Sequence, residues 1–271
     1  NGGGNDNLRV RRGAVNLATG VYYYSTTRMT TSGGSTATAV HNLYALNPAG
    51  QSWFVGTVTA PDAGQSGDLA FDASGNMYFV VGNNSTAYVN VYDGGDLPVA
   101  PNATPMAITA QRINTVGNSG NGVGIAYGKN GYLYVSNTAG NVYQVDPSSG
   151  ATTATLSGVG GSGATVDLSS CVSPSTLTVK KDYPKGRVSA SDNVTLSAWR
   201  NTNVQVGQGQ TTDGPAVGEQ TKHLGPVPIL TGEGNSYSIR ESATGASTLN
   251  AYDTSYTCVD TNDSSWPGLS G

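Results

Sequence analysis

The sequence predicts an all-β protein in two parts, a partial β-propeller of about three blades over residues 1–170 and a small β-sandwich over residues 171–271. A glycine-centred hairpin recurs three times in the first part. The composition suits water-exposed strands, with 38 glycines and 15 tyrosines against 3 phenylalanines. The second part contains alternating strands that do not follow the repeat.

The repeated hairpin is built around Gly20, Gly75 and Gly131, each followed three positions later by a tyrosine. Glycine fits a tight turn because it adopts a positive φ without steric cost, and the flanking apolar and aromatic residues favour strands. A second hairpin is predicted over residues 43–50 and 142–150, where proline and glycine form the turn. The middle repeat keeps the equivalent strand near residues 89–93. Four short strands per repeat are typical of a propeller blade.

Charge excludes one class of partner. The chain has 13 basic and 17 acidic residues, a net charge of −4 and no basic patch, so nucleic acid is not an expected partner. Arg9, Arg11 and Arg12 form the only basic run, which we interpret as a solvated strand edge. No apolar stretch is long enough to cross a membrane as a helix.

The second part begins after a glycine-rich stretch at residues 158–163 that leads to Pro174. Such residues are usual at a domain junction. Strands are predicted where polar and apolar residues alternate, at 176–181, 193–199, 237–241 and 255–259. About 100 residues with strands of this kind suggest a small sandwich.

Several segments carry a resemblance to a known family. The segments 166–171, 177–181 and 255–258, with the Tyr-x-Ile-x-Glu strand at 237–241, are similar to those of secreted actinobacterial surface proteins. In that family a propeller-like module precedes prealbumin-like domains of the kind found in Gram-positive pilins and adhesins. The resemblance implies export, display on the cell surface, and a structural or adhesive role in pilin-like filaments.

The resemblance also implies an isopeptide crosslink between a lysine on the first strand of the prealbumin-like domain and a later Asn or Asp, assisted by a buried carboxylate. Lys180 or Lys181 occupies the lysine position, and Glu241 that of the carboxylate. The final strand with its asparagine is expected beyond Gly271, because Asn250 lies in a loop-like context. In the alternative, one lysine is solvated, the other packs its stem, and Glu241 is a surface carboxylate.

Two cysteines, Cys171 and Cys258, are candidates for a disulfide in an oxidising compartment. The alternative pairs Cys258 with a cysteine outside the sequence. Neither cysteine belongs to a zinc-binding pattern. Asp93 and Asp96 are the only metal candidates, and two carboxylates make a poor calcium site.

Catalysis is not expected, because His41 and His223 are the only histidines and neither accompanies a nucleophile motif. No cofactor is predicted. Three blades cannot close a ring, and a sandwich without its last strand has an open edge. We therefore expect a protein partner or neighbouring subunit to bind through sheet edges, by strand donation, or through the loops at 30–40 and 97–111. The alternative is a propeller that binds a glycan or small molecule through tyrosine stacking; an enzyme is the weakest hypothesis.

Overall fold

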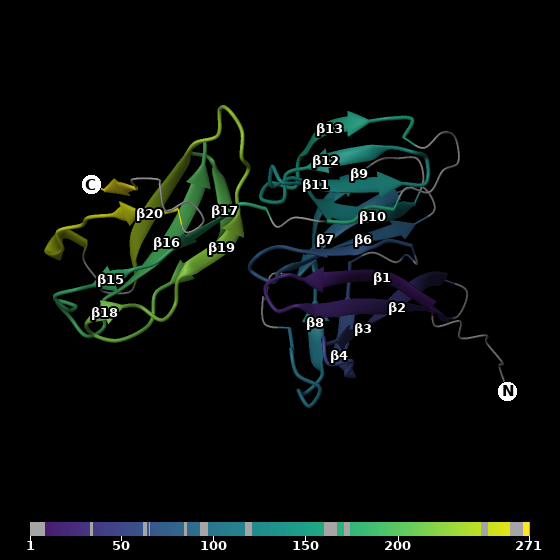
Figure 1. The fold of residues 1–271 in the computed structure, drawn as a ribbon, viewed down its shortest axis with the longest axis horizontal. Coiled ribbons are helices and arrows are strands. Elements are labelled where there is room, and N and C mark those ends of the chain that lie inside the picture. The colour runs from purple at the N-terminus through teal and green to yellow at the C-terminus, as the bar shows by residue number, and fades with distance from the viewer. Residues whose placement is uncertain are drawn as a thin grey trace. The chain divides into compact units, whose positions relative to one another are not determined.

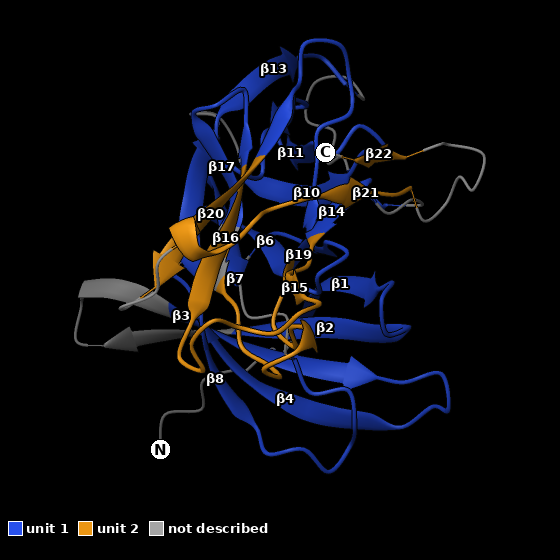
Figure 2. Cartoon of the chain, turned by 90° about the vertical axis from the view of Figure 1, so that its left-hand side faces the viewer, with its two compact units in different colours: residues 1–178, 199–207, 225–238 blue, residues 179–198, 208–224, 239–271 orange. Residues whose placement is uncertain are grey.

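The computed structural model is all-β, as predicted, and its strands form several small sheets (Figure 1). It describes residues 9–32, 35–61, 64, 66–83, 86–92, 97–116, 121–159, 167–170, 174–244, 249–260 and 268–270. Within these residues the only helical element is the 3₁₀ turn Leu249–Ala251, so no helix could cross a membrane. The chain divides into two compact units (Figure 2): unit 1 comprises residues 1–178, 199–207 and 225–238, and unit 2 comprises 179–198, 208–224 and 239–271.

Unit 1 contains three four- or five-stranded sheets that follow one another along the chain, and their pairings are antiparallel except for one. The first sheet has the order β1-β2-β3-β4-β8, in which β8 runs parallel to β4. The second sheet has the order β5-β6-β7-β9 and the third β10-β11-β12-β13. Their bounds are β1 (Arg9–Asn16), β2 (Val21–Ser32), β3 (Ser35–Leu46), β4 (Ser52–Thr59), β5 (Leu69–Phe71), β6 (Met77–Asn83), β7 (Thr86–Tyr92), β8 (Met106–Thr109), β9 (Gln111–Val116), β10 (Gly122–Tyr127), β11 (Leu133–Asn137), β12 (Val142–Val145) and β13 (Thr152–Leu156).

The repeated glycines lie in the turns that the sequence predicts. Gly20, Gly75 and Gly131 have φ values of +70°, +82° and +85°, and each ends the turn between the first two strands of its sheet. Gly50 and Gly150, in the second hairpins, have φ values of +80° and +71°. These backbone conformations are strained for residues with a Cβ, so the turns depend on glycine.

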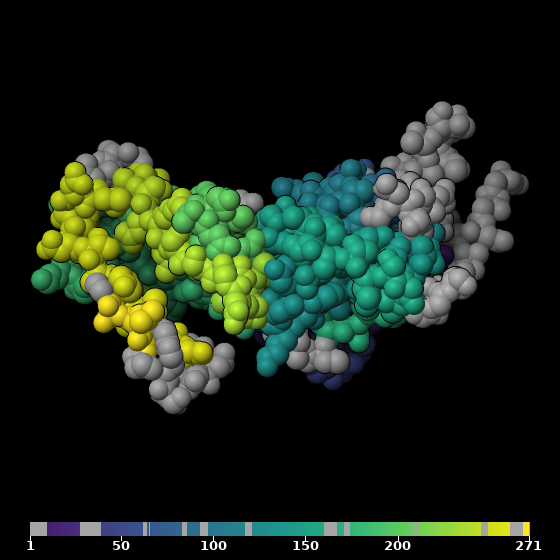
Figure 3. All heavy atoms as spheres, turned by 90° about the horizontal axis from the view of Figure 1, so that it is seen from above, coloured from purple at the N-terminus to yellow at the C-terminus, as the bar shows by residue number. Residues whose placement is uncertain are grey.

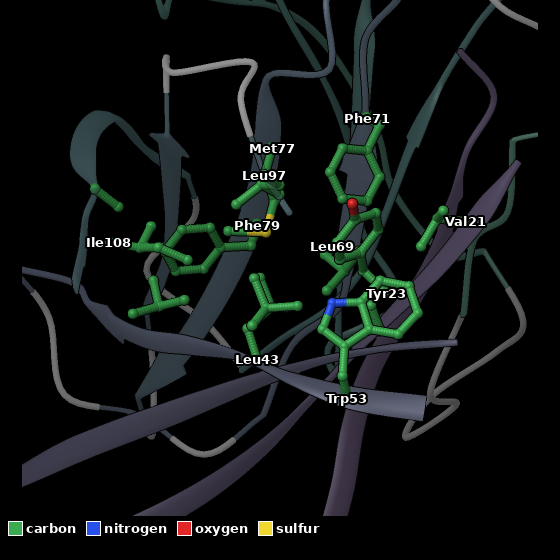
Figure 4. Packing of buried hydrophobic residues seen from close by; sticks show 14 of the residues in the cluster. Val21, Tyr23, Leu43, Trp53, Leu69, Phe71, Met77, Phe79, Leu97 and Ile108 are labelled. Carbon is green, nitrogen blue, oxygen red and sulfur yellow. The ribbon is translucent and has the colours of Figure 1, made fainter. Parts of the chain in front are cut away.

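The core of unit 1 follows from the two-residue period of the strands. Leu69 and Met77 of the second sheet contribute to a cluster with the first sheet, part of which is shown in Figure 4. The intervening Ala70 and Tyr78 contribute to a second cluster with the third sheet. Because alternate side chains point to opposite faces, the middle sheet is buried on both sides. Figure 3 shows β10–β13 (teal) as closely packed atoms.

The remaining strands form four small sheets. β14 pairs with β19, β15 with β18, and β21 with β22, while a three-stranded sheet has the order β17-β16-β20. The central β16 alternates fully between half-buried and buried residues, as its sequence predicts. The bounds are β14 (Thr176–Val179), β15 (Asp182–Tyr183), β16 (Asn193–Arg200), β17 (Val204–Thr211), β18 (Gly218–Glu219), β19 (Leu224–Pro228), β20 (Tyr237–Thr244), β21 (Thr257–Cys258) and β22 (Leu269–Ser270).

One predicted loop is a strand pair. Residues 30–40 were expected to form a recognition loop, but β2 continues to Ser32 and β3 begins at Ser35. Thr30 pairs directly with Thr38 in this long hairpin. Threonine favours strands, and the β2–β3 pairing continues through these residues. The second predicted loop, residues 97–111, contains β8.

Candidate functional site

Lys181 and Glu241, two of the three predicted crosslink residues, lie together in unit 2. Lys181 Nζ donates to Glu241 Oε1 at 3.0 Å and to Oε2 at 3.1 Å. The side chains are 13% and 23% exposed, so the pair is largely screened from water. Among the described residues, both hydrogen bonds of the ammonium go to Glu241, and no asparagine side chain joins the pair.

Aromatic rings flank this ion pair. Lys181 Nζ lies 5.2 Å from the ring centroid of Tyr183, and the guanidinium carbon of Arg187 lies 5.5 Å from the same centroid. The Tyr183 ring packs against Tyr252 at 5.6 Å. Burial, followed by the nearby Tyr252, raises the pKa of Tyr183, although Arg187 opposes the shift. A cation near an aromatic face is stabilised by the ring quadrupole, so Tyr183 helps to hold Lys181 in place.

Lys180, the other lysine candidate, lies in a different environment. Its Nζ is 2.9 Å from Glu219 Oε1, and the two side chains are 54% and 57% exposed. An exposed pair of this kind contributes little to stability. The two lysines lie between β14 and β15 and point to different partners, and Lys181 is the one beside Glu241.

The other predicted site residues are the two cysteines and the two metal candidates. Cys258 is half-buried and its thiol is free. Its proposed partner, Cys171, and the metal candidates Asp93 and Asp96 lie outside the described residues. Within the part of the chain that the structure describes, no group of three or more His, Cys, Asp or Glu residues could hold a metal ion.

Arg12 is buried, so the interpretation of the basic run as a solvated strand edge is wrong for this residue. It is 3% exposed and sits between the first two sheets. Its guanidinium donates to Val80 O at 3.1 Å, Ser66 O at 2.9 Å and Thr27 Oγ1 at 2.8 Å, and contacts His41 Nδ1 at 3.3 Å. Burial lowers the pKa of Arg12 to about 10. It therefore links β1 to β6 as a buried cation.

His41 is neutral in this setting. Burial, and then the charge of Arg12, lowers its pKa to about 3. Because Arg12 donates toward Nδ1, the ring proton belongs on Nε2, which has no protein partner. His41 and Ser25 are among the residues that line a small cavity of about 10 Å³. The arrangement supports a structural role for His41.

Asp68 directly precedes β5 of the second sheet and bonds to β1 of the first sheet and β10 of the third. Its Oδ1 accepts from Gly13 N at 3.4 Å and its Oδ2 from Ile125 N at 3.5 Å. Burial raises the pKa of Asp68 to about 6, because three backbone N–H groups only partly offset the loss of water. Its sequence context gave no sign of this role, since aspartate is common in turns.

A buried ion pair between Asp146 and Arg200 also escaped sequence reasoning. Both belong to unit 1, and their side chains are 4% and 7% exposed. Asp146 also accepts from Ser149 Oγ at 2.6 Å and Ser148 N at 2.9 Å. Burial alone would raise the pKa of Asp146, but these hydrogen bonds, led by that of Arg200, lower it. Because the two residues are far apart in sequence, no local sequence pattern could predict that they form a pair.

The first sheet carries an exposed surface that we call the aromatic face, on the side opposite the core. Its rings follow one another at short distances: Tyr22 to Tyr24 at 6.1 Å, Tyr24 to Tyr44 at 5.4 Å, and Tyr44 to Phe54 at 5.4 Å. Its six side chains come from β1 to β4, and none is charged: Val15, Tyr22, Tyr24, Tyr44, Leu46 and Phe54.

Comparison with known proteins identifies one domain. Residues 176–269 match the prealbumin-like fold domain (SpaA_3), which confirms the prealbumin-like part of the predicted fold. Domains of the SpaA type are non-catalytic and typical of surface or pilin proteins. No propeller and no enzyme family is detected, and no curated protein matches the chain.

Proposed function

We propose that the protein is a non-enzymatic structural or adhesive protein, secreted and displayed on the cell surface. The SpaA-type prealbumin-like domain at residues 176–269 carries this proposal. The three sheets of unit 1 support a propeller-like head, because each contains four consecutively or nearly consecutively paired antiparallel strands and the middle sheet packs on both neighbours. We assign residues 1–170 to this head and residues 171–271 to the prealbumin-like domain.

Sheet edges are the proposed route to a protein partner or neighbouring subunit. Among the strands that the structure describes, β13 pairs only with β12, and all five of its residues are exposed. The outer side of β13 therefore offers backbone N–H and C=O groups to an added strand. Strand addition of this kind would suit assembly into filaments.

We also propose Lys181, rather than Lys180, as the nucleophile if the prealbumin-like domain forms an isopeptide bond. The pair with Glu241 allows a proton to pass from Nζ to the carboxylate, which leaves a neutral amine. Nζ would then attack the side-chain carbonyl carbon of an asparagine, form a C–N bond and release ammonia. Glu241 would pass its proton to the departing amine and take the second proton of Nζ as the amide forms.

Intact mass spectrometry tests the crosslink. The reaction removes one ammonia, so the mass falls by about 17 Da. Lys181→Ala and Glu241→Gln should abolish that loss, whereas Lys180→Ala should retain it. An unmodified mass for the native protein would exclude the bond.

Surface display is tested on the producing cells. Antibodies raised against the purified chain should label intact cells, and protease added outside the cells should remove the label. Labelling that requires permeabilised cells would refute the proposal. An antibody against a cytosolic protein serves as the control for cell integrity.

A further inference from the structure

β13 is the outermost strand of the third sheet (Figure 1), and its outer side has no partner among the strands that the structure describes. All five of its residues, Thr152–Leu156, are exposed. Leu156, the one large apolar residue of the strand, is 64% exposed. An edge of this kind presents a row of backbone N–H and C=O groups with which a further strand can pair.

The first sheet shows that the corresponding edge accepts a strand. β4 is the fourth strand of the first sheet, as β13 is of the third, and β8 pairs in parallel with the outer side of β4. The added strand buries Ile108, which is 1% exposed, in the core cluster of unit 1. Beside β13 no described strand fills the equivalent place. The fold therefore covers this edge at β4 and leaves it open at β13.

The edge at β13 also lacks the usual protection against pairing with its own kind. Native edge strands commonly carry charged side chains or proline, and β13 has neither. The chain has no charged residue between Asp146 and Asp167. By contrast, β9, which ends the second sheet, contains the exposed Arg112, and β1, which begins the first, contains the exposed Arg11.

The regular part of the edge is residues 154–156. At the start of β13, Thr152 Oγ1 accepts a hydrogen bond from Asn114 Nδ2 of β9 at 3.1 Å. The register with β12 then shifts at Thr153, whose hydroxyl donates to Gln144 Oε1 at 2.9 Å. The three residues that follow pair regularly with β12, and Thr155 is the central one.

We propose that β13 pairs in antiparallel fashion with β13 of a second copy of the chain. The inference rests on the proposed surface display and names the neighbouring subunit as the partner. Two uncharged edges do not repel each other, and threonines opposite one another across strands form favourable pairs. Centred on Thr155, the arrangement places Ala154 of each copy opposite Leu156 of the other. Such a pairing about a twofold axis uses the same edge twice and closes on itself.

The short edge makes this a weak contact. Stable interfaces bury roughly 1,200 Å² or more, and a pair of five-residue strands covers less. We therefore expect a Kd of about 0.1–1 mM in solution. Copies held side by side on one cell surface meet at effective concentrations of about 1 mM, as linked binding modules do, so the contact forms there.

Two other occupants fit the edge less well. A charged peptide strand would find no charge of opposite sign on residues 147–166. The strand β8 of a second copy is already held in its own chain, where it pairs with β4 and buries Ile108. Donating β8 would therefore cost that copy part of its core.

Sedimentation equilibrium of the full chain at concentrations up to about 1 mM tests the proposal. The parent protein should associate. Thr155→Lys and Thr155→Glu should each weaken association at least about fivefold, because like charges would face each other across the strand pair. An equimolar mixture of the two variants should regain association, since the introduced charges are then opposite. Thr109→Lys is the matched control, because Thr109 is an exposed threonine of β8, the edge strand of the first sheet.

Circular dichroism of each variant must match the parent protein, so that lost association is not lost folding. The proposal is overturned if the parent stays monomeric at about 1 mM, if Thr155→Lys associates as the parent does, or if the mixture associates no better than its components. It is also overturned if Thr109→Lys weakens association as much as Thr155→Lys does. Failure here leaves surface display intact, because antibody labelling of intact cells tests that separately.

Discussion

Replacement of Arg12 by methionine should destabilise unit 1, because the change removes a buried cation but leaves its acceptors in place. Val80 O, Ser66 O and Thr27 Oγ1 would each lose a partner at 2.8–3.1 Å. Each buried polar group left without a partner lowers the free energy of unfolding by about 1–3 kcal/mol. Part of this loss is offset, because the variant no longer has to remove the arginine from water. We expect a net loss of about 3–5 kcal/mol, as for other broken buried charge networks.

Thermal unfolding measures this loss. A change of that size should lower Tm by roughly 10 °C in a unit of this length. The fluorescence of Trp53, a member of the adjoining core cluster, reports on the same region. Arg11→Met is the matched control, because Arg11 is exposed and should shift Tm by less than about 2 °C. Equal effects of the two substitutions would refute the argument that Arg12 acts through its burial.

Three further predictions concern unit 1. Because the pKa of His41 falls from 6.5 to about 3 on folding, the unfolded chain alone is protonated between these values, so stability should fall as pH drops through this window. Urea titrations of His41→Gln should show a flatter pH dependence, and an unchanged slope would contradict the assignment. Arg200→Met should cost about 3–5 kcal/mol at pH 7, because it leaves the buried Asp146 carboxylate unpaired, and less at acidic pH, where protonation of that carboxylate removes the charge; calorimetry at neutral and acidic pH checks this. Gly20→Ala should cost about 1–2 kcal/mol from its positive φ alone, whereas Gly131→Ala should cost more, because its Cβ would lie 2.2 Å from Ile229 O; equal Tm shifts would contradict this.

Local signals predicted much of the fold. The repeated glycines, the Pro–Gly hairpins and the alternation at residues 193–199 all correspond to turns and strands of the structure. β17 was missed because Val204–Thr211 contains glycine and glutamine where strands usually carry branched or aromatic residues. β8 was missed because four residues give too short a pattern.

The site residues were less predictable because their pairing depends on tertiary structure. The resemblance to pilin-type domains singled out Lys181 and Glu241, yet it left Lys180 equally eligible. Arg12 differs from Arg11 only in the face of β1 it occupies, and a bulge between Val10 and Arg12 sets that face. The aromatic face could have been suspected from Tyr22 and Tyr24, two residues apart on one strand, but its width depends on the register with Tyr44 and Phe54.

The two-sided burial of the middle sheet has a consequence for how unit 1 unfolds. Detaching either the first or the third sheet would expose one side of β5 and β6 to water. The loss of one outer sheet would therefore weaken the middle sheet, against which the other outer sheet packs. The first and third sheets should therefore unfold together. Amide protons in β2 and β11, which belong to different outer layers, should therefore exchange with similar protection through one concerted opening.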